Sequence, residues 1–141
     1  MINTIRLSSE VNARPEDVEI IQNGIDEFNM AYTGDRNYRP VRIFLRDEAD
    51  QICGGITADL WGGWMHVEAL WMDEGLRGQD FGTQLMEAAE REARAHGCHH
   101  AFLETFSFQA RPFYERLGYK VIATLDNYPA GEQHFVLKKT L

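Results

Sequence analysis

The chain has 141 residues and a formal net charge of −8, with 14 Lys and Arg against 22 Asp and Glu. Hydrophobic residues make up 44% and charged residues 26%, the balance of a soluble globular domain, and no apolar run approaches the roughly 18 residues that span a membrane. The acidic composition weighs against a nucleic-acid partner and is compatible with a cationic substrate such as an amine. No signal peptide is visible, so we expect a cytoplasmic protein with a single domain over residues 1–141.

The first part of the sequence predicts a strand, a helix and a loop. Residues 2–7 are expected to form a short strand. Pro15 suits the first turn of a helix. Apolar residues recur at helical spacing and should give that helix a buried face: Val18, Ile21, Ile25 and Phe28. The polar residues 31–40 predict a loop.

The rest of the sequence predicts alternating strands and helices. Residues 41–61 should form two strands around a turn at 47–51, and residues 64–73 a third strand. The helix expected over residues 81–96 ends at Gly97 and has one apolar side, formed by Leu85, Met86, Ala89 and Ala93. A strand (100–107), a short helix (109–118) and two strands (119–125, 133–141) follow. The fold class is therefore α/β: a mixed, mostly antiparallel central sheet flanked by helices, with one parallel crossover.

A turn rich in glycine and arginine joins the third strand to the long helix. Gly78 and Gly82 let backbone approach a ligand closely, and the first N–H groups of a helix have no intrahelical partner. With the helix dipole, these groups favour a phosphate or pyrophosphate, although many glycine turns bind nothing. The segment has neither the GK[ST] of a P-loop nor the GxGxxG of a Rossmann turn.

Two motifs resemble those of the GNAT superfamily of N-acetyltransferases. The segment from Arg77 to Gly82 is similar to motif A, [Q/R]-x-x-G-x-[G/A], with Asp80 where the middle glycine usually stands. Ala110-x-x-Phe113-Tyr114-Glu115-x-x-Gly118-Tyr119 is similar to the family signature A-x-x-[FL]-Y-x-x-x-G-[FY]. The resemblance covers residues 41–139. It implies the acyl-CoA N-acyltransferase fold of this family, in a small bacterial-type single-domain member.

The resemblance implies an acetyl-CoA-dependent N-acetyltransferase. In such enzymes the motif A turn holds the pyrophosphate of the co-substrate, and the preceding strand splays from the next one to admit the pantetheine arm. The residues expected to bind acetyl-CoA are then Leu70, Trp71, Met72, Arg77, Gly78, Gln79, Asp80, Gly82, Thr83, Ser107 and Gln109. We expect Asp80 to cap the helix with its side chain. Ser107 stands where many members carry an asparagine, so Ser107 or Gln109 should replace that contact.

The reaction needs a group that accepts a proton from the amine and a group that protonates the departing thiolate. Tyr114 matches the tyrosine that commonly serves the family as general acid; a packed aromatic with a hydrogen-bonded hydroxyl is the alternative. Glu68 is the first candidate base, because a carboxylate within an apolar strand is costly unless it meets water, a ligand or an ion pair. Regular alternation puts Glu68 on one face with His66, Leu70 and Met72. His66 is the second candidate base, since imidazoles generally titrate near neutral pH.

Three residues are candidates for binding the acceptor amine: Asp35, Tyr38 and Glu104. We expect a small molecule, because no second domain for a protein acceptor is evident. Cys98, His99 and His100 are adjacent and point to alternating faces, so they do not converge and we assign no metal.

Association and alternative functions stay open at this point. Trp61, Trp64 and Trp71 lie on or beside the central strands and are compatible with a homodimer, or equally with core packing. An acyl-CoA sensor without turnover and a structural dimerisation module are the alternatives to an enzyme.

Overall fold

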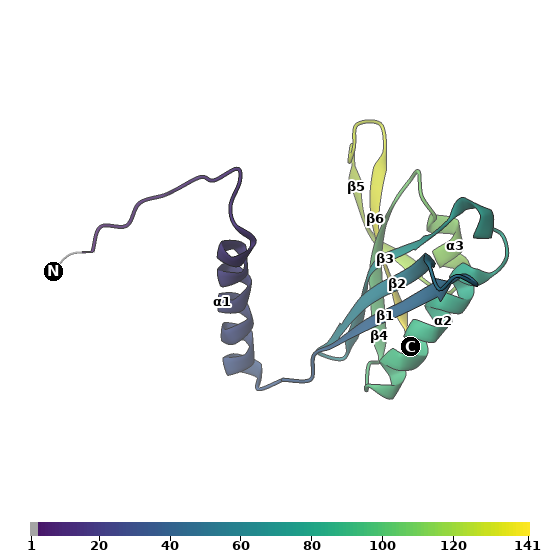
Figure 1. Ribbon diagram of the computed structural model, residues 1–141, viewed down its shortest axis with the longest axis horizontal. Helices are drawn as coiled ribbons and strands as arrows, with labels where there is room; N and C mark the ends of the chain where they lie inside the picture. Colours follow the sequence, from purple (N-terminus) through teal and green to yellow (C-terminus); the bar gives the residue numbers. More distant parts are fainter. Residues whose placement is uncertain (1–2) are drawn as a thin grey trace. The chain divides into compact units, whose positions relative to one another are not determined.

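The computed structural model describes residues 3–141 and divides into unit 1 (Met1–Arg36) and unit 2 (Asn37–Leu141) (Figure 1). Unit 1 contains one helix, α1 (Pro15–Thr33), and residues 3–14 before it form neither helix nor strand. The strand predicted over residues 2–7 is therefore wrong for residues 3–7; residue 2 lies outside the described residues. Ile5 and Leu7 are almost fully exposed and no described strand pairs with them, so a ladder cannot form.

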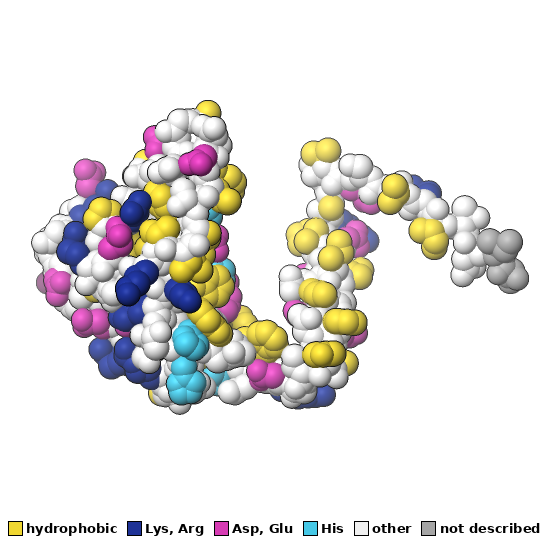
Figure 2. Space-filling model, turned by 180° about the vertical axis from the view of Figure 1, so that it is seen from behind, with side chains coloured by type: hydrophobic (Ala, Val, Ile, Leu, Met, Phe, Trp, Pro, Cys, Tyr) yellow, Lys and Arg dark blue, Asp and Glu magenta, His cyan; other side chains and the backbone are white. Residues whose placement is uncertain are grey.

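Helix α1 forms where the sequence predicts it, and within unit 1 its apolar face is exposed. Pro15 lies in the first turn, and Gly34 ends the helix in the left-handed conformation (φ 66°). Hydrophobic side chains, yellow in Figure 2, follow the helix, and none of its residues is buried. The four residues predicted to be buried, Val18, Ile21, Ile25 and Phe28, are 49–75% exposed. Within the described part of unit 1 no second element packs against this face, so its predicted burial stays a prediction.

Unit 2 is built on one six-stranded sheet with the order β1-β2-β3-β4-β6-β5. The strands are β1 (Arg39–Arg46), β2 (Ile52–Trp61), β3 (Trp64–Met72), β4 (His100–Phe106), β5 (Lys120–Asp126) and β6 (Gln133–Thr140). Neighbours are antiparallel except β3 and β4, which are parallel. The crossover between them contains η1 (Glu74–Leu76) and α2 (Phe81–Ala95), and α3 (Arg111–Arg116) links β4 to β5. The predicted fold class is confirmed.

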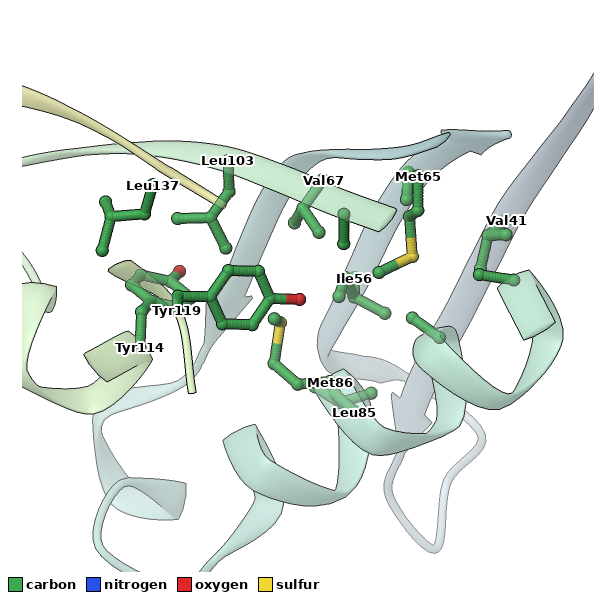
Figure 3. Close-up of a cluster of buried hydrophobic side chains, with 14 of the residues drawn as sticks. Val41, Ile56, Met65, Val67, Leu85, Met86, Leu103, Tyr114, Tyr119 and Leu137 are labelled. Atoms are coloured by element: carbon green, nitrogen blue, oxygen red, sulfur yellow. The ribbon is translucent and has the colours of Figure 1, made fainter. Parts of the chain in front are cut away.

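The core of unit 2 lies between α2 and one face of the sheet. Leu85, Met86, Ala89 and Ala93 are buried, as the helical spacing predicts. Every second residue of the strands faces them, and Figure 3 shows the strand side chains directed toward the helix: Val41, Ile56, Met65, Val67, Leu103 and Leu137. This packing holds the first turn of α2 close to the end of β3. Among the described residues, no helix is both long enough and apolar enough to cross a membrane.

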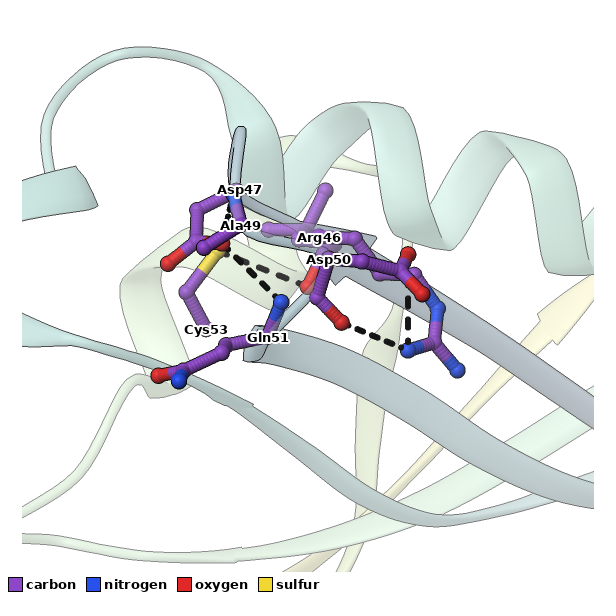
Figure 4. A network of polar contacts seen from close by, with 7 residues as sticks. Arg46, Asp47, Ala49, Asp50, Gln51 and Cys53 are labelled. Atoms are coloured by element: carbon purple, nitrogen blue, oxygen red, sulfur yellow. Dashed lines mark hydrogen bonds and ion pairs between the residues drawn. The ribbon is translucent and has the colours of Figure 1, made fainter.

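The turn between β1 and β2 is held by the side chain of Asp47 (Figure 4). Its Oδ1 accepts hydrogen bonds from the backbone N–H of Ala49 (2.8 Å) and Gln51 (2.9 Å). Asp50 takes a left-handed conformation (φ 62°), and Arg46 donates to its backbone oxygen (3.0 Å). Aspartate favours such turns because its short side chain bonds nearby backbone N–H groups. The turn predicted at residues 47–51 is confirmed.

Strand β3 contains a β-bulge at Glu68. Thr57 and Ala58 of β2 pair with Ala69 and Val67, so Glu68 has no partner on β2. One extra residue shifts the side-chain alternation by one position.

The bulge changes which β3 side chains share a face. Before it Val67 faces the core, and after it Leu70 and Met72 pack against the core. Leu70 pairs with the buried Ile56 of β2, whereas Ala69 pairs with Thr57, whose side chain points to the opposite face. The predicted common face for His66, Glu68, Leu70 and Met72 is therefore wrong, because His66 and Leu70 lie on opposite faces.

A charged side chain is buried beside the core. Glu90 of α2 is only 3% exposed, and Lys139 Nζ donates to both of its carboxylate oxygens (2.8 and 3.1 Å). The Tyr119 hydroxyl also donates to Glu90 (3.0 Å), and Arg94 lies 3.7 Å away. Burial and the charge of Glu90 raise the pKa of Tyr119. Glu90 is compensated mainly by Lys139.

Replacing Lys139 by methionine should lower the free energy of unfolding by about 3 kcal/mol, because the variant leaves a buried carboxylate without its main counter-charge. Urea denaturation would measure this. Lys138→Met is the matched control, since Lys138 is the exposed neighbour on β6. Equal losses in the two variants would show that the buried pair contributes nothing specific.

Candidate functional site

A groove of about 1030 Å³ opens between β3 and β4 and reaches the start of α2. The two strands pair only through residues 64–66 and 100–102, and then they diverge. Backbone N–H and C=O groups that point from residues 67–72 toward β4 therefore have no ladder partner on that side. Such groups need a hydrogen-bonding partner, which an extended ligand can supply. Strands β3 and β4 therefore separate beyond these residues, as the family resemblance implies.

The turn before α2 forms one end of the groove. Gly78 and Asp80 take left-handed conformations (φ 76° and 70°), and Gln79 Nε2 donates to the backbone oxygen of Gly75 (2.8 Å). Asp80 makes no side-chain cap, so the predicted capping is wrong. A capping residue normally has extended backbone angles that aim its side chain at the first N–H groups, and Asp80 does not. The first turn of α2 therefore keeps its N–H groups free of a side-chain cap.

Gly82 lies in that first turn, against side chains from two other elements. A Cβ at Gly82 would lie 3.2 Å from Phe113 Cζ and 3.4 Å from Met72 Cε. Both distances are tighter than ordinary carbon–carbon contacts. The glycine thus lets β3, α2 and α3 meet at the groove.

Most residues predicted to bind acetyl-CoA line the groove: Leu70, Trp71, Met72, Arg77, Gly78, Gln79, Asp80, Gly82, Thr83 and Gln109. Ser107 is not among the lining residues. Its hydroxyl donates to Glu132 and accepts from the N–H of Gln133 (2.9 Å), which ties the end of β4 to β6. Gln109 Oε1 accepts from the N–H of Phe106 (2.8 Å), which fixes this side chain at the wall of the groove.

Helix α3 presents Tyr114 to the groove. Its ring lies 5.1 Å from that of Phe113 and 6.3 Å from that of Tyr119, centroid to centroid, and the residue is 8% exposed. Burial raises the pKa of the Tyr114 hydroxyl. The hydroxyl therefore carries its proton at neutral pH, as a proton donor must.

Glu68 lines the groove from the other side and forms a carboxyl pair with Asp59. The hydrogen bond with Asp59 raises the pKa of Glu68, and burial and the charge of Asp59 add to this. Burial would raise the pKa of Asp59, but hydrogen bonds from Glu68 and Tyr38 and the charge of Arg42 outweigh it and lower the pKa. The pair therefore favours a proton on Glu68 over one on Asp59.

Tyr38 and Arg42 hold Asp59 in place. The Tyr38 hydroxyl donates to Asp59 Oδ1 (2.5 Å), and Arg42 Nη2 lies 3.5 Å from the same atom. The hydrogen bond to Asp59 and burial raise the pKa of Tyr38. Tyr38 therefore supports the carboxyl pair and does not line the groove. Asp35 belongs to unit 1, where its N–H donates to Thr33 Oγ1 (3.1 Å), and its predicted role stays a prediction.

Glu104 of β4 lines the groove between two histidines. His66 Nε2 lies 3.4 Å from Glu104 Oε1, and His134 Nε2 lies 3.6 Å from Oε2. His66 stacks on Phe102 with a centroid separation of 4.3 Å and does not itself line the groove. Within residues 3–141, His134 Nδ1 is buried without a hydrogen-bond partner. His66 thus contacts Glu104 at the groove and does not reach the groove itself.

Several residues near the groove were missed by the sequence analysis. Asp59 was missed although its sequence pattern is the same as that of Glu68. It is a carboxylate within an alternating apolar strand, ITADLW. His134 has no comparable signal, because its relation to Glu104 depends on the pairing of β4 with β6. Further groove residues were missed, although the last four lie within the second motif: Phe81, Phe108, Ala110, Phe113, Arg116 and Leu117.

Comparisons with known proteins agree with this architecture. The model of the acetyltransferase (GNAT) family matches residues 9–119. The chain is 36% identical over 107 residues to blasticidin-S acetyltransferase of Streptomyces morookaense, covering 73% of this chain and 79% of the relative. A crystal structure of a candidate acetyltransferase from Agrobacterium tumefaciens superposes with a TM-score of 0.90 at 30% identity, over 98% of this chain and 100% of that one.

A more distant solved structure shares the fold. An aminoglycoside 6′-N-acetyltransferase complexed with coenzyme A has a TM-score of 0.62 at 18% identity, over 94% of this chain and 95% of that one. On the family match and the identity to the relatives, the chain belongs to the acetyltransferase (GNAT) family.

Proposed function

We propose that the protein is an N-acetyltransferase that transfers the acetyl group of acetyl-CoA to a primary amine of a small molecule. The observation that carries this proposal is the opening of the sheet between β3 and β4, which brings Glu68, Tyr114 and the uncapped start of α2 to one groove. The coenzyme A in the aminoglycoside 6′-N-acetyltransferase supports the choice of co-substrate. The name of blasticidin-S acetyltransferase supports a small-molecule acceptor.

The groove fits a long ligand with an anionic middle part. Residues 67–72 offer unpaired backbone groups to an extended pantetheine arm, and the first turn of α2 offers N–H groups to a pyrophosphate. Arg77 and Arg116 add positive charge to the lining, and Asp80 opposes it. Acetyl-CoA would supply the activated acetyl thioester.

Glu68 acts as the general base in this proposal. The ammonium form of the acceptor must lose one proton before its nitrogen can form a bond to the thioester carbon. An ionised Glu68 accepts that proton directly or through a water, and its raised pKa makes it a stronger base than an ordinary glutamate. Asp59 keeps its negative charge and raises the proton affinity of Glu68.

Tyr114 acts as the general acid. When the carbon–sulfur bond breaks, the sulfur leaves as a thiolate and takes one proton from the Tyr114 hydroxyl. The reaction consumes one amine and one acetyl thioester and yields one amide and one thiol. The nitrogen loses its second proton as the amide forms, and this proton returns through water to the Tyr114 oxygen. Glu68 releases the first proton to water, so both residues regain their starting states.

The acceptor is expected to be cationic. Glu68 and Glu104 line the groove and Asp59 lies beside Glu68, in a chain of net charge −8. Such a field concentrates cations and disfavours anionic acceptors. We include Glu104 as the second acceptor-binding residue, steadied by His66 and His134.

The homodimer stays a prediction. Trp61 and Trp71 are 40% and 55% exposed, whereas Trp64 is half-buried and stacks on His100 at 4.6 Å. Two of the three tryptophans are thus accessible to a partner.

The proposal is tested by incubating the protein with acetyl-CoA and a panel of amines while free thiol is followed. We expect thiol release with cationic small molecules and none without an amine. Tight binding of acetyl-CoA without release by any amine would indicate a sensor, and the absence of binding would indicate a structural module.

A further inference from the structure

Four aromatic residues gather where β4 ends, and we call them the aromatic cluster. Phe106 and His134 pair across β4 and β6, Tyr128 belongs to the β5–β6 loop, and Phe108 follows β4. The Phe106 ring stacks on those of Phe108 and Tyr128, each at 5.2 Å, with interplanar angles of 10° and 13°. The His134 ring lies 4.8 Å from Phe106 and 5.0 Å from Tyr128, centroid to centroid. The sequence analysis assigned no role to this cluster.

The aromatic cluster lies on the same face of the sheet as Glu104. Side chains alternate along β4, so Phe106 and Glu104 lie on the face opposite to Leu103, which is directed toward α2. His134 joins the cluster to this carboxylate, because its Nε2 lies 3.6 Å from Glu104 Oε2. Phe108 lines the groove, so the cluster borders the part of the groove proposed to bind the acceptor.

Hydrogen bonds hold the two segments of the cluster together. Gln109 Oε1 accepts from the N–H of Phe106 (2.8 Å), which fixes the end of β4. The N–H of Ser107 donates to the backbone oxygen of Gln133 (2.8 Å), and the Ser107 hydroxyl accepts from the N–H of Gln133 (2.9 Å). These bonds join the end of β4 to the loop that carries Tyr128. Rings that are already held in place lose little conformational freedom when a ligand binds.

Two rings of the cluster remain accessible beside a negative charge. Phe108 and Tyr128 are 59% and 52% exposed, although both stack on Phe106. A further flat ring can therefore extend the stack, and an offset arrangement of aromatic rings is favourable beyond the apolar area that it buries. Glu104 next to the stack attracts a positive charge. The surface thus combines a feature that selects a flat ring with one that selects a cation.

We propose that the aromatic cluster is a subsite for a flat aromatic or heteroaromatic ring of the acceptor. The inference rests on the proposed function and narrows its acceptor to cationic amines that carry such a ring a few bonds from the nitrogen. The ring stacks on Tyr128 or Phe108, and the ammonium group lies near Glu104. A saturated ring of similar size gains apolar burial there but no ring stacking.

A matched pair of acceptors tests this subsite. Phenethylamine and cyclohexylethylamine carry a primary amine on the same linker and differ in whether the ring is flat. With saturating acetyl-CoA, the wild type should show a kcat/KM about fivefold higher for phenethylamine, as aromatic pairs commonly contribute. The difference should fall on KM, because ring stacking is the same before and during acetyl transfer. Thiol release measures both rates.

Variants of the cluster should remove this preference. Tyr128→Leu and Phe106→Leu should each reduce it to less than about twofold, whereas Tyr128→Phe should keep it because the ring is retained. Phe44→Leu is the matched control, since it removes another exposed ring on β1, at the edge of the sheet away from β4. Thermal melts verify that each variant folds. Tyr128 lies in a loop, so its variants test the subsite even if Phe106→Leu does not fold.

Equal kcat/KM values for the two amines in the wild type would overturn the inference and leave the proposed function intact, because thiol is still released. A preference that survives in both leucine variants would overturn it in the same way. A changed sedimentation coefficient in Tyr128→Leu with an unchanged preference would instead assign the rings to a contact between copies of the chain. If no amine releases thiol, the proposed function fails and the inference fails with it.

Discussion

Tyr114→Phe should lower kcat about 100-fold while leaving the Kd of acetyl-CoA and the stability nearly unchanged. Phenylalanine keeps the ring that packs near Phe113 and Tyr119, and only the hydroxyl is lost. Loss of a general acid typically costs a factor of 10² to 10⁴, and the effect falls on the step that breaks the carbon–sulfur bond. Single-turnover kinetics would measure this step directly.

Tyr119→Phe is the control that the chain itself offers. It removes the hydroxyl of the neighbouring tyrosine, which donates to Glu90 and does not line the groove. We expect this variant to be less stable by about 1 kcal/mol, as for one lost hydrogen bond, with kcat unchanged. Wild-type kcat in Tyr114→Phe would show that the thiolate leaves without help from this residue.

Glu68→Gln should lower kcat/KM about 100-fold at neutral pH, because the glutamine amide cannot accept the proton of the amine. The wild-type rate should fall as pH decreases through the pKa of Glu68, since only the ionised carboxylate is a base. The hydrogen bond with Asp59 raises that pKa, so the acidic limb should lie above the pH at which an ordinary glutamate titrates. In Glu68→Gln this limb is lost, and the activity recovers as pH approaches the pKa of the free amine.

Asp59→Asn tests whether the charge of Asp59 raises the pKa of Glu68. Without the charge of Asp59, the pKa of Glu68 should drop toward its ordinary value, so the acidic limb moves to lower pH and the base becomes weaker. Asp50→Asn, in the exposed β1–β2 turn, should leave the profile unchanged. A wild-type pH profile in Glu68→Gln would instead assign proton removal to water or to Glu104 with His66.

The regular parts of unit 2 were predictable because their signals are local. Leu85, Met86, Ala89 and Ala93 recur with the helical period, and Asp47 bonds the backbone of its own turn. The two motifs located the ends of the groove, since the turn before α2 and the first turn of α3 are continuous segments. Ten of the residues assigned to acetyl-CoA do line the groove for this reason.

The parts that were missed depend on contacts between distant segments or on one extra residue. The pairing of Asp59 with Glu68 and of Glu104 with His134 arises from strand register. The run WMHVEALWM contains apolar residues at both parities after Val67, so its sequence cannot show where the alternation changes. The helical pattern of α1 was correct, but whether its face is buried depends on what lies beside it.

The bulge at Glu68 has a consequence for comparing or redesigning relatives of this chain. Deleting Glu68 would remove the bulge and leave the pairing of Ala69 with Thr57 and of Leu70 with Ile56 in place, so Leu70 and Met72 would keep the core face. A sequence alignment would record that change as one small gap. The groove would nevertheless lose the carboxylate that is proposed as the general base. Homologues with identical motifs and one residue fewer at this point of the strand would therefore keep the wall of the groove and lack its base.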